Sequence, residues 1–360
     1  MSQIIIYIMV LFSVLGAVDN LLDNKFGIGE KFQEGIEAMG SLVLTMLGIY
    51  CLSPVIAERL IPILSSMSKA TGVDPSVFIA SILAPDMGGY TSAMKVMNNE
   101  AIGHFSGLIL SSSIGATISF TTPIAINILK DDFPQYAKGI MAGFITIPIG
   151  AFVGGVIMEI PGKELIINLI PVLILSAILV VYLIKAQEKV VKVFTWIGKI
   201  LIIISTMGLI IGILDFVLDI KLFSNMISIE EGLVVIGQIA IILSGAYPLF
   251  HVLHKLFNKH LSQIGNKLGI NEVAVLGLIT SLVNSIPMFL IYKDMDERGK
   301  NLNAAFLVSG AYAFGGQLGF ISSISKEMVS PFIVSKLVGG ITAILLSYLL
   351  TKNLLKTELE

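Results

Sequence analysis

Apolar stretches of membrane-crossing length follow one another along almost the whole chain. Of the 360 residues, 55% are hydrophobic and only 13% are charged, whereas a soluble chain carries about 25% charged residues. About 20 consecutive apolar residues are enough for a helix to cross the hydrocarbon core of a bilayer. The stretches lie at 3–22, 36–64, 76–96, 101–129, 136–160, 164–185, 196–218, 231–257, 272–293, 302–323 and 331–351. The sequence therefore predicts an all-α integral membrane protein in a lipid bilayer, with 9 to 11 membrane segments.

The chain also repeats itself. Asp19 follows Gly16, and Asp215 follows Gly212, at the same spacing and 196 residues later. Further pairs keep this order at offsets of 197 to 200 residues: Glu34 and Glu231, Gly40 and Gly237, Tyr50 and Tyr247, Gly72 and Gly269, and Gly115 and Gly315. The pattern predicts two related five-segment repeats, at 1–160 and 194–360, joined by a connecting helix within 161–193. Such duplication is typical of secondary transporters.

The third segment of each repeat is interrupted in its middle. Pro85, Gly88 and Gly89 break the first, and Pro287 breaks the second. Proline removes a backbone donor and clashes with the preceding turn, and glycine weakens a helix further. Backbone groups freed at membrane depth are tolerated only where protein buries them or where they line a wet cavity. A binding site at the two breaks is the favoured interpretation, and a simple proline kink is the alternative.

The basic residues bear on the topology. If both broken segments turn back as hairpins, nine crossings remain, and the 23 Lys and Arg residues split into 7 on the N-terminal side and 16 on the other. The positive-inside rule then places the N-terminus outside and the C-terminus in the cytoplasm, and the repeats are inverted. If all eleven segments cross, the split is 13 to 10 and the repeats are parallel. The hairpin arrangement is preferred.

Asp86 is the best candidate for chemistry, because an acid at mid-membrane costs about 2.5–3.5 kcal/mol on insertion scales and defaults to a functional interpretation. Its symmetry mate lies near Asn284. One carboxylate and one amide suit a small cation that carries a hydroxyl group. The alternative is that Asp86 only caps the N-terminus of a half-helix.

Four further residues are candidate substrate contacts. Gln317 lies in a glycine-flanked stretch that allows close backbone approach, and Thr121 belongs to a polar stripe in the fourth segment. Tyr50 and Tyr247 form a duplicated pair whose rings could face a cation. Helix packing and anchoring at the membrane interface are the alternatives for these four.

Other features exclude function classes or indicate structural roles. Asp19 and Asp215 lie near the ends of equivalent helices, so they are assigned as structural acids. They form a formal pair for an intramembrane aspartyl protease, but the signatures of that class are missing, so an enzyme is not expected. The single cysteine, Cys51, rules out a thiolate metal site, and no basic run indicates nucleic-acid binding. A non-transporting receptor would not need matched helix breaks. A homo-oligomer stays open.

Several ordered motifs resemble one known family. They are Asp86-Met87-Gly88-Gly89-Tyr90, Thr146-Ile147-Pro148-Ile149-Gly150, Gly245-Ala246-Tyr247-Pro248, Ile286-Pro287-Met288-Phe289, Met295-Asp296-Glu297-Arg298-Gly299-Lys300 and Lys336-Leu337-Val338-Gly339-Gly340. In these motifs, and over the length from Asp19 to the last helix, the chain resembles the EutH family of ethanolamine-utilisation membrane proteins.

The resemblance implies a multi-pass protein of the bacterial cytoplasmic (inner) membrane that admits ethanolamine for breakdown and needs no cofactor. Two positions depart from the family pattern. Some members carry an Asn-Asn pair where this chain has Asn284 and Ser285, and an Asp-His pair where it has Gly316 and Gln317. A proton-accepting histidine at 317 is therefore not carried over. An ion-coupled permease or antiporter for another small amine or metabolite is the alternative function.

Overall fold

The computed structural model describes residues 2–257 and 260–357 and, within them, contains helices and no strand. Its helices are α1 (Ser2–Leu21), α2 (Gly29–Leu42), α3 (Gly48–Thr71), α4 (Pro75–Ala80), α5 (Gly89–Val96), α6 (Glu100–His104), α7 (Thr122–Leu129), α8 (Phe133–Ile157), α9 (Gly162–Lys185), α10 (Gln187–Leu218), α11 (Ile229–Phe257), α12 (Leu261–Leu268), α13 (Glu272–Ser281), α14 (Ser285–Ile291), α15 (Glu297–Gly310), α16 (Gly316–Ile324) and α17 (Val329–Thr357). Wider π-helical turns occupy Val43–Leu47, Phe105–Gly115 and Thr117–Thr121.

Seven helical stretches in the described part of the chain are long and apolar enough to cross a membrane. The longest of them, Glu100–Ile157, has 58 residues and changes direction at Lys130, whose φ of 45° lies in the left-handed region. Because α7 and α8 pack together on either side of this turn, the stretch consists of two legs. The chain is a multi-pass membrane protein.

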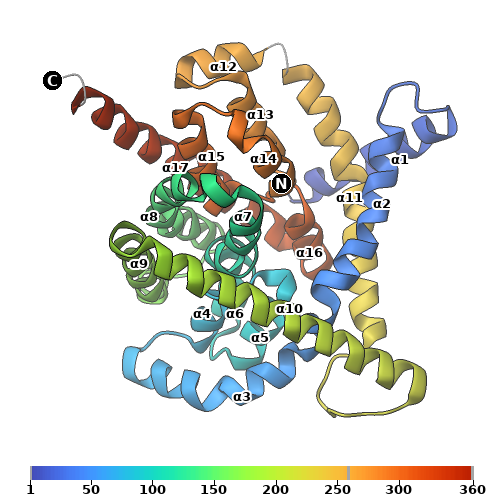
Figure 1. The fold of residues 1–360 in the computed structure, drawn as a ribbon. Coiled ribbons are helices and arrows are strands. Elements are labelled where there is room, and N and C mark those ends of the chain that lie inside the picture. Colours follow the sequence, from blue (N-terminus) through green and yellow to red (C-terminus); the bar gives the residue numbers. More distant parts are fainter. Residues whose placement is uncertain (1, 258–259, 358–360) are drawn as a thin grey trace.

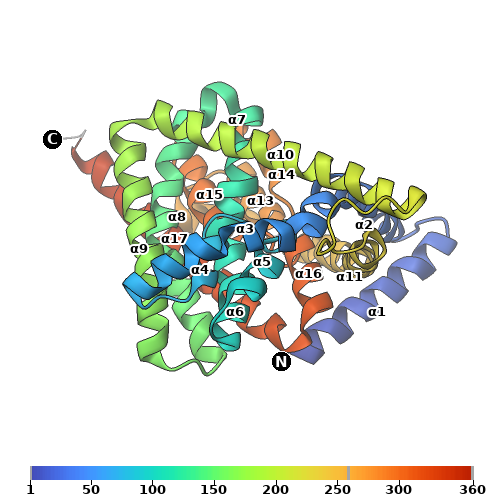
Figure 2. The ribbon, with the colours of Figure 1, turned by 90° about the horizontal axis from the view of Figure 1, so that it is seen from below.

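The longer helices form two groups. One consists of α1, α2 and α11, and the other of α8, α15 and α17, with α9 packed on α8. In Figure 1, α2 and α11 run up the page, whereas α8 and α9 are seen nearly end-on; Figure 2 shows the reverse. The long helix α10 crosses the molecule and packs on α3, α7 and α9. Each group contains helices from both halves of the sequence, so the halves are interleaved.

Small residues bring the crossing helices into close contact. A Cβ atom added to Gly48 would lie 1.8 Å from the Ser205 carbonyl oxygen on α10, and one added to Gly245 would lie 2.0 Å from the Met9 carbonyl oxygen on α1. Gly48 and Gly245 are 197 residues apart, and Met9 and Ser205 are 196 apart. Two glycines that are 197 residues apart thus make the same kind of close contact, each with the backbone of another helix.

The third segment of each half turns back on itself. In the first, the Asp74 carboxylate before α4 accepts hydrogen bonds from the backbone N–H groups of Asn98 and Asn99 after α5, both at 3.0 Å. In the second, the N–H of Asn271 before α13 donates to the Asp296 carboxylate at 2.8 Å. A kinked but continuous helix would hold its ends far apart. Both segments are therefore helical hairpins, and in Figure 1 α4–α5 reaches the centre from below and α13–α14 from above.

The stretch 302–323 differs from the continuous helix expected from its apolar sequence. It is broken between Gly310 and Gly316, where Tyr312 has a left-handed φ of 62°. The N–H of Tyr312 donates to the Ser281 carbonyl at 3.0 Å, and the N–H of Phe314 donates to the Leu282 carbonyl at 2.9 Å. The break between Gly310 and Gly316 thus supplies backbone donors for two carbonyl groups at the tip of the second hairpin.

Candidate functional site

Residues of both hairpin tips line a cavity of about 360 Å³. Its walls come from the two tips, the turn of Phe120, the start of α16, and facing residues of α2 and α11. The lining residues are Ala38, Ser41, Leu42, Thr45, Ala84, Asp86, Ala116, Phe120, Ile124, Leu243, Tyr247, Val283, Asn284, Ile286, Tyr312, Gly316 and Gln317. Within this set, Asp86 is the one residue that carries a carboxyl group, and none carries a basic group. The cavity thus carries a single negative formal charge.

The first hairpin tip presents Asp86 to this cavity. Ala84 is extended (ψ 152°), the chain then forms a short 3₁₀ turn at Pro85–Met87, and Gly88 adopts a φ of 83° that glycine accepts without steric cost. Ser119 accepts the freed N–H of Ala84 at 3.0 Å and donates to the Gly115 carbonyl at 2.8 Å. The break is therefore held by side-chain bonds, which fix the position of Asp86.

The second hairpin tip places Asn284 on the opposite wall. Its Oδ1 accepts the N–H of Ile286 at 3.0 Å and caps α14, while Nδ2 has no hydrogen-bond partner among the described residues. Pro287 lies in the first turn of α14, where a missing N–H costs nothing. Asn284 can therefore cap its helix and still offer a donor to the cavity.

Tyr312 is a cavity residue that the sequence analysis missed. Its hydroxyl group bonds with Ser285 Oγ at 2.5 Å and with Thr121 Oγ1 at 3.3 Å. Thr121 is buried behind this tyrosine and does not line the cavity. The only hint in the sequence is that Tyr312 and Ser285 are polar residues in largely apolar stretches. No local sequence pattern predicts that they bond with each other.

Gln317 supplies an acceptor without a partner. Its side chain is 5% exposed, and Oε1 makes no hydrogen bond within the described part of the structure. A buried polar atom left unpaired costs about 1–3 kcal/mol, so native proteins usually pair it. Because Gln317 lines the cavity, its free oxygen is suited to accept a hydrogen bond from a bound molecule.

The duplicated tyrosines have different surroundings. Tyr247 lines the central cavity and also a neighbouring cavity of about 260 Å³, which shares Val283 and Asn284 with it. Tyr50 does not line the central cavity; its ring packs edge-on against Phe320, with centroids 6.4 Å apart. Of the six candidate contacts, Asp86, Asn284, Gln317 and Tyr247 thus share one cavity, whereas Tyr50 and Thr121 do not line it.

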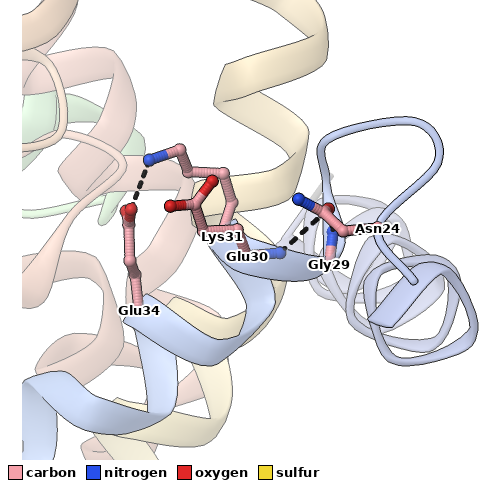
Figure 3. Close-up of polar contacts among 5 residues, drawn as sticks. All are labelled: Asn24, Gly29, Glu30, Lys31 and Glu34. Atoms are coloured by element: carbon pink, nitrogen blue, oxygen red, sulfur yellow. Dashed lines mark hydrogen bonds and ion pairs between the residues drawn. The ribbon is translucent and has the colours of Figure 1, made fainter. Parts of the chain in front are cut away.

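The neighbouring cavity connects this region with charged residues of α2. Lys31 and Glu34 form an ion pair on one face of that helix (Figure 3) and line the cavity with His251. The start of α2 is fixed by Asn24, whose side-chain oxygen accepts the N–H groups of Gly29 and Glu30 (Figure 3). An ion pair therefore lines the cavity that lies next to the central one.

The two acids assigned as structural have different partners. Asp19 is buried, and its carboxylate accepts the N–H groups of Phe26, Ile28 and Gly29, each at 2.9 Å. These bonds tie the loop after α1 to the start of α2. Asp215 lies on α10, with no side-chain hydrogen bond in the described structure. The two acids therefore do not share one structural role.

Comparison with known proteins identifies the family. Residues 1–350 match the family described as "Ethanolamine utilisation protein, EutH". The chain is 43% identical to "Probable ethanolamine permease EutH" of Listeria monocytogenes, over 99% of this chain and 95% of that protein. It is 40% identical to "Uncharacterized protein YxeR" of Bacillus subtilis (95% and 93%). It is 36% identical to "Probable ethanolamine permease EutH" of Salmonella typhimurium (100% and 98%). No solved structure matches the chain. With a family match over nearly its whole length, this chain belongs to the EutH family of ethanolamine utilisation proteins.

Proposed function

We propose that this protein carries ethanolamine, as the protonated cation, across the bacterial cytoplasmic membrane by alternating access. The observation that supports this most is that the Asp86 carboxylate and the unpartnered Oε1 of Gln317 line the same cavity. A primary amine is protonated at neutral pH, as lysine is. Its ammonium group brings three donors and a positive charge, which match a carboxylate and a free acceptor.

Each end of ethanolamine has a partner in this arrangement. The ammonium group pairs with Asp86 and donates to Gln317, while the hydroxyl group accepts from Nδ2 of Asn284. Tyr247 closes the cavity toward the neighbouring one and presents its ring to the cation. The permease names of two relatives agree with a transported amine.

We propose further that the repeats are inverted, with the N-terminus outside and the C-terminus in the cytoplasm. Two observations support this: the equivalent contacts of Gly48 with Ser205 and Gly245 with Met9, and the hairpins that approach from opposite sides (Figure 1). Two related repeats favour alternating access in which one repeat moves against the other. Because helices of both halves lie together in each helix group, we propose instead that the two helix groups are the moving bodies. Access to the cavity then alternates as one group shifts against the other.

Cysteine labelling tests the inverted arrangement. Asn98 and Lys293 are exposed near the ends of the first and second hairpins, and the native Cys51 is buried. In a Cys51→Ser background, we expect Asn98→Cys to react with a membrane-impermeant maleimide from outside intact cells. Lys293→Cys should react only after the cells are permeabilised. Reaction of both from the same side would contradict inversion.

The transport function is tested by uptake into proteoliposomes that contain the purified protein. We expect labelled ethanolamine to enter these vesicles and not protein-free ones. Unlabelled ethanolamine should compete, and propanol, which lacks the charge, should not. Failure of ethanolamine to enter, together with uptake of another small amine driven by a sodium or proton gradient, would favour the ion-coupled alternative.

Replacing Gln317 should weaken ethanolamine binding without lowering the stability of the protein. Gln317→Leu keeps the volume but removes the acceptor, so we expect the half-saturation concentration for ethanolamine to rise about tenfold or more, the equivalent of about 1.4 kcal/mol or more. Because the substitution also removes a buried unpaired atom, the melting temperature should stay the same or rise. A variant with unchanged half-saturation would remove Gln317 from the site.

A further inference from the structure

A lysine is buried inside the last helix. Lys336 lies on α17, two turns from its start, and its side chain is 1% exposed. A charged side chain in an apolar membrane segment is costly and usually pairs or has a function. The family resemblance assigns no role to this lysine, and it does not line the central cavity.

The surroundings of Lys336 leave its charge without a close partner. Nζ donates to the Ser112 carbonyl at 2.6 Å and lies 5.8 Å from the centre of the Phe332 ring. It forms no ion pair within the described part of the chain. A neutral carbonyl and a ring face satisfy a donor, but they do not neutralise a buried positive charge.

Asp86 and Lys336 lie on two elements that pack against the same π-helical stretch, Phe105–Gly115. The turn Pro85–Met87 contacts this stretch, and so does α17, while the two side chains form no ion pair among the described residues. Ser112, which holds Nζ, is one helical turn before Ala116, and Ala116 lines the cavity beside Asp86. In a medium of low dielectric constant, opposite charges that are not in direct contact still attract one another by an appreciable amount.

We propose, on the basis of the transport function proposed above, that Lys336 is an internal counter-charge that neutralises Asp86 when the site is empty. The empty site then has no net charge, and the empty carrier can change conformation without exposing an uncompensated carboxylate to a low-dielectric environment. When the substrate ammonium pairs with Asp86, it competes with Lys336 for the same carboxylate. Lys336 thereby weakens binding enough for release and permits the return step.

Lys336→Met, which keeps an unbranched side chain of nearly the same length and removes the charge, tests this role. We expect the equilibrium dissociation constant for ethanolamine to fall about tenfold. The substitution removes the positive charge that competes with the substrate for Asp86, and the attraction between these charges is partly screened by their surroundings. Vesicles loaded with unlabelled ethanolamine should still exchange it for labelled ethanolamine, since only the loaded carrier moves. Net uptake into empty vesicles should be lost, because the empty carrier with an unbalanced Asp86 returns slowly.

Lys336→Gln provides the second variant, since it keeps a donor for the Ser112 carbonyl while removing the charge. It should show the same separation of exchange from net uptake if Lys336→Met does not fold. A purely structural lysine would lower exchange and net uptake together, with weaker binding, and that result would overturn the proposal. If the wild-type protein does not carry ethanolamine at all, the transport function itself fails. If the wild type does and the folded variants keep both modes unchanged, only the counter-charge role fails.

Discussion

Uptake of ethanolamine at low external concentration should fall at least about 100-fold when Asp86 is replaced by asparagine. Asn keeps the shape of the side chain and removes its charge, so the substrate ammonium loses its counter-ion in a partly enclosed cavity. Loss of one partner of a desolvated charge pair costs about 2–5 kcal/mol, and a 100-fold change corresponds to about 2.7 kcal/mol. The measurement is the initial rate of labelled ethanolamine uptake in proteoliposomes.

A matched control separates this effect from a general change of charge. Asp131 is exposed in the turn between α7 and α8, far in sequence from the hairpin tips and absent from the cavity lining. Asp131→Asn should therefore transport at the wild-type rate. A folded Asp86→Asn protein with wild-type uptake would rule out the counter-ion role of Asp86.

The second large effect concerns the helix crossings. Gly48→Ala and Gly245→Ala should each destabilise the protein by about 3 kcal/mol or more, because the new Cβ would lie 1.8 Å or 2.0 Å from a backbone oxygen of another helix. The helices must separate, since backbone cannot rotate away as a side chain can. The measurement is the melting temperature of the purified protein in detergent.

The chain offers its own control for this prediction. Gly40 and Gly237 are also related by the repeat, and a Cβ atom at either would have no atom within 4 Å. Gly40→Ala and Gly237→Ala should leave the melting temperature unchanged or raise it, since alanine favours a helix by about 1 kcal/mol over glycine. Equal melting temperatures for Gly48→Ala and Gly40→Ala would show that the crossings are not as close as described.

The sequence predicted the features that depend on local chemistry. Proline and glycine at Pro85, Gly88 and Gly89 have strong intrinsic backbone preferences, so the first helix break, with Asp86 inside it, could be inferred without a structure. The membrane class followed from apolar length alone. The offset of 197 residues also relates Gly48 and Gly245, and a Cβ atom at either would clash with the backbone of another helix; the repeat itself stays a prediction.

Features imposed by distant contacts could not be predicted. The break at Tyr312 has no local cause: a tyrosine with φ of 62° is locally unfavourable, and it is stabilised by bonds to Ser281 and Ser285 of another segment. Lys336 was counted among the basic residues of one membrane side, whereas it is buried. A lone lysine several residues inside an apolar stretch was a signal that could have indicated this.

The most direct test of the binding site is an experimental structure determined in saturating ethanolamine. The ammonium nitrogen should lie about 2.7–2.9 Å from an Asp86 carboxylate oxygen, with Gln317 Oε1 as its second acceptor and the hydroxyl group directed toward Asn284. Ethanolamine bound elsewhere, with Asp86 joined directly to Lys336 and the central cavity unoccupied, would contradict this account.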